Sequence, residues 1–325
     1  MKLIASLICL QLLVSVGLSQ TLPAPVSYLQ TRYHATNFDI AWNAPDHSWT
    51  NKVWIYKDTA AKFSDDVISN LLEIGSYTQQ DKKDYGIYGI TAYDSGRVLR
   101  VATMTGKITY YAPQLYGTDH LVTNLPGTNE AIVLTKQILS RIGISLSNIE
   151  HASNGELLFH YDPKQQGTIY YTTNLPIVNL NHRPIGFKRT LDGLTVNGNG
   201  GIGTIDYGEN GIVIQMDIEW RGMTRESEYD TATKDDMLRW LKDGHCYFPR
   251  SFYPTHKEHI DIDWTKAKHL TINRVQVCYW GIDFPDNNPP VKSTVSPYAI
   301  LYATVDTGQT NLDVEIDSPI INPNK

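Results

Sequence analysis

The chain has 325 residues, a formal net charge of −6 and an apolar fraction of 41%, which together are typical of a globular protein rather than a disordered one. Acidic and basic side chains are interspersed, and no block of lysines and arginines occurs. This pattern argues against nucleic acid and against an anionic membrane surface as partners. The length permits one large domain or two domains of ordinary size.

The N-terminus has the three parts of a secretory signal peptide, spanning residues 1–19. Lys2 supplies a positive charge, Leu3–Val16 is an apolar run, and Gly17 and Ser19 are the small residues expected before a cut at Gln20. The run is shorter than the roughly 20 residues of a transmembrane helix, so we expect cleavage, with an uncleaved anchor as the alternative. The sequence therefore predicts a secreted protein, extracellular or periplasmic, with no membrane span after cleavage.

Signal cleavage removes Cys9 and leaves Cys246 and Cys278. An even pair of cysteines in an exported protein predicts a disulfide. Two separately buried thiols are an equal alternative, because sequence spacing alone does not bring two Cα atoms within bonding range.

Three segments repeat apolar residues at helical spacing, and each follows a side chain that can cap a helix. Ser64, Thr128 and Thr233 are the expected N-caps, and a glycine ends or closely follows each segment. The expected helices are Asp65–Ile74, Asn129–Ile142 and Lys234–Asp243.

The rest of the chain is rich in β-branched and aromatic residues and is divided by Gly, Asn and Asp, which is typical of strands joined by turns. Gly208–Gly211 is a particularly strong hairpin signal. The expected strands are Gly86–Tyr93, Val98–Met104, Lys107–Tyr111, Glu156–Tyr161, Thr168–Thr173, Gly203–Tyr207, Ile212–Trp220, Leu270–Trp280, Tyr298–Asp306 and Leu312–Ile316.

A helix followed by paired strands occurs three times along the sequence. We therefore expect an α+β fold of short helices packed on antiparallel sheets, in repeated helix-plus-hairpin units whose helix covers one sheet face. Pro113 and Gly117 interrupt the pattern, which places a boundary near Ala112–His120, with one continuous structure of three units as the alternative. The expected divisions are the signal peptide at 1–19, an N-terminal α+β unit at 20–117 and tandem α+β units at 118–325.

The order of these units resembles PepSY-like domains, in particular the exported parts of YycI/YycH-type regulators. The resemblance covers roughly residues 121–318 and is carried by turn and core residues in Gly186–Met223, Leu270–Gly281 and Ser296–Gly308. It implies a PepSY-like fold and a binding or regulatory function, and it supplies no catalytic residue. Those regulators stay anchored beside a sensor kinase, whereas a cleaved chain is released, so the resemblance does not extend to kinase regulation.

Gly198–Gly203 matches the G-x-G-x-x-G pattern of dinucleotide-binding loops. That motif requires a following helix whose N-terminal amides hold the phosphates, whereas Thr204–Tyr207 is strand-like. We therefore expect a flexible or bulged crossing between two strands and predict no cofactor.

His256 and His259 have H-x-x-H spacing, with Asp261 close behind. Zinc requires three or four converging ligands, and Pro254 favours a loop over the helix that would align the two histidines. A solvated polar loop is the preferred interpretation, so no metal site is predicted and these three residues are weak candidates only.

Asp217 and Glu219 flank Ile218 and therefore share one face of a strand, next to Trp220. Paired carboxylates near an aromatic residue serve glycoside hydrolysis in some enzymes, which makes these two acids the candidate catalytic residues. Two acids on an exposed strand face are the commoner alternative.

Trp42, Trp49, Trp54 and Tyr56 crowd one short segment, with Asn and Asp between them. Aromatic rings beside polar groups suit sugar or peptide binding, so these four are the candidate binding residues. Ordinary sheet core is the alternative.

The first functional hypothesis is a non-catalytic binding or regulatory protein that recognises a protein or an extracellular polymer through a sheet face or edge. The alternatives are a secreted hydrolase acting on a glycan and a structural component of an envelope or matrix. A pocket with two facing carboxylates favours the hydrolase, whereas a contiguous exposed aromatic patch favours binding.

Overall fold

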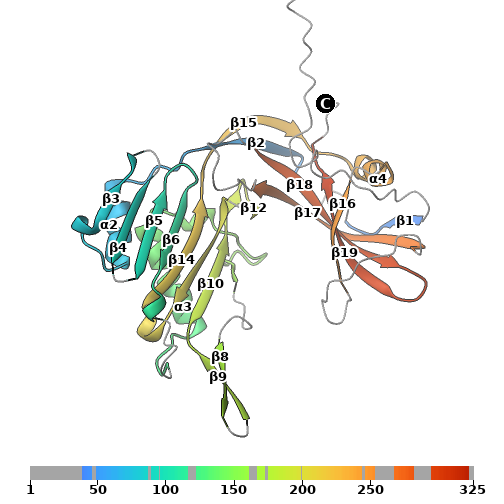
Figure 1. Cartoon of the computed structure of the whole chain (residues 1–325). Coiled ribbons are helices and arrows are strands. Elements are labelled where there is room, and N and C mark those ends of the chain that lie inside the picture. Colours follow the sequence, from blue (N-terminus) through green and yellow to red (C-terminus); the bar gives the residue numbers. More distant parts are fainter. Residues whose placement is uncertain are drawn as a thin grey trace, which may run out of the picture.

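In the described part of the chain, the computed structural model contains two large β-sheets, a separate two-stranded sheet and three α-helices (Figure 1). The described residues are 39–45, 49–86, 89–94, 96–115, 122–160, 167–172, 175–198, 200–243, 246–252, 267–281 and 294–321. The predicted signal peptide lies outside these residues.

The three predicted helices are confirmed to within a residue of their expected ends. Ser64 caps the first helix by accepting a hydrogen bond from a backbone amide of the first turn, and Thr233 forms a capping box with Asp236. Thr128 is the first helical residue rather than the N-cap, which is Gly127. The helices are α2 (Asp65–Ile74), α3 (Thr128–Arg141) and α4 (Lys234–Lys242).

One large sheet has eight strands that are all antiparallel, and we call it the eight-stranded sheet. In spatial order its strands are β3 (Lys82–Asp84), β4 (Ile90–Asp94), β5 (Arg97–Ala102), β6 (Lys107–Tyr111), β14 (Val213–Trp220), β13 (Gly201–Tyr207), β10 (Arg183–Lys188) and β7 (Phe159–His160). Two distant parts of the sequence meet where β6 pairs with β14, with Ile108 opposite Ile218.

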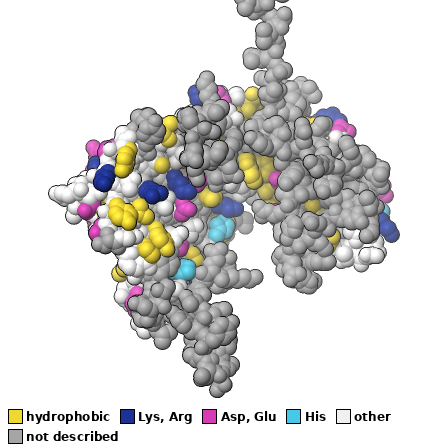
Figure 2. Space-filling model, in the orientation of Figure 1, with side chains coloured by type: hydrophobic (Ala, Val, Ile, Leu, Met, Phe, Trp, Pro, Cys, Tyr) yellow, Lys and Arg dark blue, Asp and Glu magenta, His cyan; other side chains and the backbone are white. Residues whose placement is uncertain are grey.

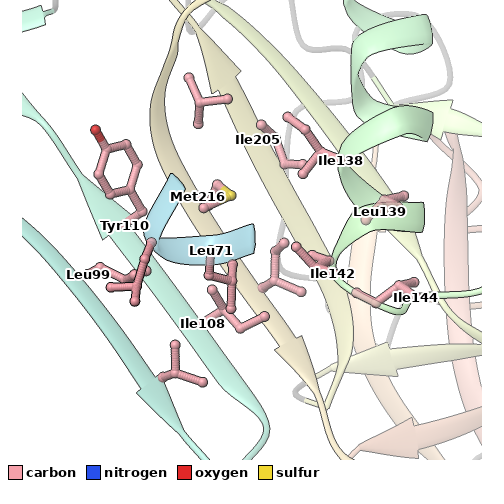
Figure 3. Close-up of a cluster of buried hydrophobic side chains, with 14 of the residues drawn as sticks. Leu71, Leu99, Ile108, Tyr110, Ile138, Leu139, Ile142, Ile144, Ile205 and Met216 are labelled. Atoms are coloured by element: carbon pink, nitrogen blue, oxygen red, sulfur yellow. The ribbon is translucent and has the colours of Figure 1, made fainter. Parts of the chain in front are cut away.

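One face of the eight-stranded sheet is buried under α2 and α3 (Figure 3). Leu71 of α2 and Leu139 of α3 pack in one cluster with Ile108, Ile205 and Met216 of the sheet, and all five side chains are fully buried. Burial of each such side chain stabilises the fold by about 1.5–3 kcal/mol. Successive side chains of a strand point to opposite faces. The residues that alternate with the buried ones along each strand therefore point away from the helices.

The other large sheet has nine strands, and we call it the nine-stranded sheet. Its strands are β1 (Asp39–Trp42), β2 (Lys52–Thr59), β11 (Thr190–Leu191), β12 (Leu194–Gly198), β15 (Gly222–Asp230), β16 (Tyr247–Phe252), β17 (His269–Gly281), β18 (Thr294–Asp306) and β19 (Asn311–Pro319). β17, β18 and β19 form its antiparallel centre, and β1 and β12 pair with β17 in parallel. Both large sheets contain strands from either side of residue 117, the predicted boundary.

Both faces of the nine-stranded sheet are buried along β18. Ala299 and Leu301 belong to a cluster that includes Met237 and Leu241 of α4. Tyr298 and Ile300 alternate with these residues and belong to a second cluster on the opposite face. The sequence of β18 is therefore almost continuously buried.

The two large sheets are joined where β14 leads into β15 at Arg221. Arg221 donates a hydrogen bond to Asp58 of β2 at 2.9 Å, and both side chains are more than nine-tenths buried. A Cβ on Gly200 would lie 2.9 Å from the Arg221 side chain, and a Cβ on Gly201 would lie 2.6 Å from Val196. Gly200 and Gly201 therefore lie in a closely packed crossing from β12 to β13, where a side chain would not fit. A crossing between two strands was predicted here, but a flexible or bulged one.

The expected α+β fold of repeated helix-plus-hairpin units is wrong, because the protein is a sheet-rich fold with two large sheets. α2 and α3 cover the same face of one sheet instead of one hairpin each. The strands that follow a helix also pair with strands far away in the sequence, as β6 does with β14. The predicted hairpin between Glu156–Tyr161 and Thr168–Thr173 is not formed, since β7 pairs with β10 and β8 (Gly167–Thr172) pairs with β9 (Leu175–Leu180).

Candidate binding surface

The face of the eight-stranded sheet that points away from α2 and α3 carries exposed side chains on β4, β5, β6 and β14, and we call it the open face. Hydrophobic, basic and acidic side chains are interspersed over this sheet in the space-filling view (Figure 2). The residues of the open face on these four strands are Thr91, Tyr93, Val98, Arg100, Lys107, Thr109, Tyr111, Gln215, Asp217 and Glu219.

An aromatic row crosses the open face. Tyr93 of β4 is opposite Val98 of β5, and Val98 is opposite Tyr111 of β6, so the three side chains are neighbours on one side of the sheet. Tyr93 is 66% exposed and Tyr111 is 41% exposed. We call Tyr93, Val98 and Tyr111 the aromatic row; it leads on to Gln215 and then to Asp206 of β13.

Two polar rows run beside the aromatic row. The first consists of Arg100, Thr109 and Asp217, which are opposite one another on β5, β6 and β14. The second pairs Lys107 of β6 with Glu219 of β14. Residues two positions apart on a strand are about 7 Å apart, so a ligand on the aromatic row lies within reach of the first polar row.

Lys107 lies between the two predicted catalytic acids. Its Nζ is 3.6 Å from Asp217 Oδ1 and 3.2 Å from Glu219 Oε1, and Glu219 also accepts a hydrogen bond from the Gly200 amide at 3.2 Å. The prediction that the two acids share one face is confirmed. Both carboxylates contact the same ammonium group, and the three groups together form an ion-pair network.

A buried carboxylate lies at the end of the aromatic row. Asp206 is 7% exposed, and its Oδ1 has no hydrogen-bond partner within the described part of the chain. Burial raises the pKa of this carboxyl to about 6, because the ionised form is disfavoured away from water. The charge at this end of the row therefore changes between mildly acidic and neutral pH.

The edges of the eight-stranded sheet are short. β3 has three residues, including Lys82 and Lys83, and β7 has two. Short strands and edge lysines hinder the pairing of a further strand. The open face, rather than either edge, is therefore the surface of this sheet that is accessible to a partner.

The four aromatic residues predicted to bind lie in the nine-stranded sheet or beside it, not on the open face. Trp42 and Trp49 pack edge to face with ring centroids 6.2 Å apart, and Trp49 donates its indole N–H to a backbone carbonyl at 3.2 Å. Tyr56 is buried and Trp54 packs against the same cluster, half-buried. The structure thus divides the four residues between two hydrophobic clusters, where they pack as core residues do.

Cys246 and Cys278 are both free and buried, so the predicted disulfide is not present. Cys246 belongs to the cluster of Ala299, whereas Cys278 belongs to the cluster of Tyr298. Because Tyr298 and Ala299 are consecutive residues of β18 and point to opposite faces, the sheet lies between the two thiols. Burial raises the pKa of each thiol to about 12, which keeps both thiols protonated at neutral pH.

The weak metal candidates His256, His259 and Asp261 lie outside the described residues. Among the residues that are described, no three or more His, Cys, Asp or Glu side chains are placed to hold a metal ion together. None of the described helices combines the length and the hydropathy required to cross a membrane.

Sequence analysis missed Tyr93 and Tyr111 as candidate binding residues. Strand alternation predicts their exposure once the buried face is known. Ala92 and Tyr110 are buried, so the next residue of each strand points to the other face. What the local patterns do not contain is the register, which makes both tyrosines neighbours of Val98.

Comparisons with known proteins do not identify the chain. No protein-family model matches it, and no curated protein matches it. It is similar to the crystal structure of an uncharacterized protein from Eubacterium rectale, with 12% sequence identity, a TM-score of 0.43, and coverage of 86% of this chain and 85% of that one. The likeness carries no argument about function, and the resemblance to PepSY-like domains stays a prediction.

Proposed function

We propose that this is a secreted, non-catalytic binding or regulatory protein that recognises a protein or an extracellular polymer through the open face. The observation that carries the proposal is the aromatic row, in which Tyr93 and Tyr111 expose large rings on either side of Val98. Contiguous exposed apolar surface, rimmed by polar residues, marks interaction sites in proteins. Here the rim consists of the two polar rows.

The acids beside the aromatic row support binding rather than hydrolysis. Asp217 and Glu219 share the ammonium group of Lys107, and the Asp217 side chain is 51% exposed. Because both carboxylates are held by this positive neighbour, they are suited to accept hydrogen bonds from a ligand.

The secreted state is supported by the signal-peptide pattern of residues 1–19. We expect the N-terminus of the protein recovered from the medium or the periplasm to be Gln20, as read by N-terminal sequencing or mass spectrometry. Recovery of the chain only in the membrane fraction, beginning at Met1, contradicts secretion and leaves the binding role of the open face to be judged separately.

Capture experiments test the binding role. The purified secreted protein is immobilised and exposed to the medium and envelope of the cells that produce it, in parallel with the double variant Tyr93→Ala/Tyr111→Ala. Tyr85→Ala is the matched control, because Tyr85 is 57% exposed but lies outside the aromatic row. We expect the double variant to lose the captured material and the control to retain it. Equal capture by all three proteins contradicts the proposal.

A further inference from the structure

We propose that the ligand of the open face is a neutral glycan chain, an inference that rests on the function proposed above and names its ligand class. The observations that carry it are the spacing of the two tyrosines, the balance of charge around them and the types of hydrogen-bonding group within reach. Each points to a hydroxyl-rich ligand with apolar ring faces.

The tyrosines are spaced to contact an extended chain of sugar rings. Tyr93 and Tyr111 lie on β4 and β6, which are separated by β5 alone. Neighbouring strands are about 4.8 Å apart, so the two side chains start roughly 10 Å apart across the sheet. The C–H faces of sugar rings pack on an aromatic ring, and the tyrosine hydroxyl remains hydrated. A glycan lying across the strands therefore contacts both rings, with Val98 beneath it.

On β4, β5, β6 and β14 the charges of the open face balance, while Asp206 lies buried beyond them on β13. Arg100 and Lys107 are positive, Asp217 and Glu219 are negative, and Lys107 contacts both acids. A polyanion would be repelled by the acids as strongly as it is attracted by the bases, and a polycation would meet the reverse. Charge complementarity therefore favours a ligand with no net charge.

The polar rows offer every kind of hydrogen-bonding group that sugar hydroxyls use. A hydroxyl both donates and accepts, and the guanidinium of Arg100 donates, the carboxylate of Asp217 accepts, and the hydroxyl of Thr109 does both. These three side chains are opposite one another on adjacent strands. Hydrogen bonds to the charged members are the stronger ones, at about twice the strength of neutral bonds.

A protein ligand fits these observations less well. The buried centre of a protein interface is depleted of charged residues. An apolar protein side chain over the aromatic row would remove water from the neighbouring ion pairs, and the desolvation penalty of such pairs can exceed their Coulombic attraction. Sugar hydroxyls replace the water around those groups instead. The open face therefore favours a glycan over an apolar protein surface.

Binding to defined polysaccharides tests the inference. The purified secreted protein is measured by affinity electrophoresis and calorimetry against cellulose oligomers, chitin oligomers, soluble β-1,3-glucan, starch and mannan, with heparin and polygalacturonate as charged comparisons. We expect binding to at least one of the neutral glycans that is unchanged between 0.05 and 0.5 M salt, since screening weakens only charge-driven binding.

The variants assign that binding to the open face. Tyr93→Ala and Tyr111→Ala should each raise the Kd at least about tenfold, which corresponds to about 1.4 kcal/mol. Tyr85→Ala removes an exposed tyrosine outside the aromatic row and should bind as the unmodified protein does. Thermal unfolding of each variant confirms that it is folded. Binding that is restricted to heparin and lost in salt overturns the glycan inference.

The remaining outcomes separate the inference from the proposed function. If no neutral glycan binds but a protein is captured in a way that depends on Tyr93 and Tyr111, the glycan inference fails and the binding role of the open face stands. If a neutral glycan binds and the double variant Tyr93→Ala/Tyr111→Ala binds it equally well, both fail.

Discussion

The two large sheets differ in how many of their faces they bury. Along β18 of the nine-stranded sheet, Tyr298 and Ala299 point to opposite faces and both are buried. Along β14 of the eight-stranded sheet, Met216 is buried and Asp217 is exposed. The eight-stranded sheet thus leaves a whole face of its central strands open, and recognition is expected there.

The largest effect that tests this comparison is expected for Tyr298→Ala. The side chain is 4% exposed, packs edge to face with Trp280, and its hydroxyl accepts a hydrogen bond from Asn197 at 2.8 Å. Removal of a large buried aromatic side chain costs about 3–5 kcal/mol, and urea unfolding measures it. If the free energy of unfolding falls no more than for a surface substitution, this face of the nine-stranded sheet is not a hydrophobic core.

The junction between the sheets should be nearly as sensitive. Asp58→Ala leaves the Arg221 guanidinium buried without its carboxylate, and the removal of one partner of a buried ion pair costs about 3–5 kcal/mol. Lys52→Ala is the control. Lys52 lies on β2 like Asp58, but its ion pair with Glu228 of β15 is exposed, so its loss should change stability little. Equal effects of the two substitutions in chemical denaturation would contradict the structural role of the junction.

A smaller, pH-dependent effect is expected for Asp206→Asn. The folded pKa of Asp206, about 6, lies above its ordinary value of 3.8, so the folded state binds the extra proton between these values. Stability from this group is therefore present at low pH and lost as pH rises through about 6, by at most about 3 kcal/mol.

Urea unfolding of both proteins at several pH values measures this effect. The stability of the variant relative to the unmodified protein should rise between pH 4 and pH 6 and stay level above about pH 7, where the carboxylate is ionised in both states. A difference that does not depend on pH would show that Asp206 is not titrating in the folded protein.

The smallest effect is expected for Tyr93→Ala on the open face. An exposed side chain outside any core changes stability by no more than about 0.5 kcal/mol, so the midpoint of thermal unfolding should barely move. A large drop would show that the aromatic row is packed rather than available, and it would remove the contrast between the two sheets.

The local elements were predictable from the sequence because their signals are local. Ser64 and the spacing of Ile68, Leu71 and Leu72 define α2 without reference to the rest of the chain. Lys107–Tyr111 is a strand at the predicted residues for the same reason. The pair of β13 and β14 was predictable from the hairpin signal at Gly208–Gly211. The long-range pair of β6 and β14 was not, since these strands meet across more than 100 residues of chain and nothing in either strand specifies the other.

The same distinction between local and long-range features applies to the candidate site. Period-two alternation placed Asp217 and Glu219 on one face, which the structure confirms, but Lys107 reaches them only through the pairing of β6 with β14. Likewise the prediction of one helix per hairpin failed because α2 and α3 share one sheet. Properties of one element, and pairs joined by a tight turn, could be read from the sequence, whereas contacts between elements distant in the sequence could not.

The short edge strands of the eight-stranded sheet, one of which carries two lysines, have a consequence for self-assembly. A sheet whose outermost strands have three and two residues offers a second copy too little backbone for continuous strand pairing, so it resists growth into sheet polymers and fibres. The protein can thus expose tyrosines on this sheet, even at high protein concentration, without polymerising through its edges.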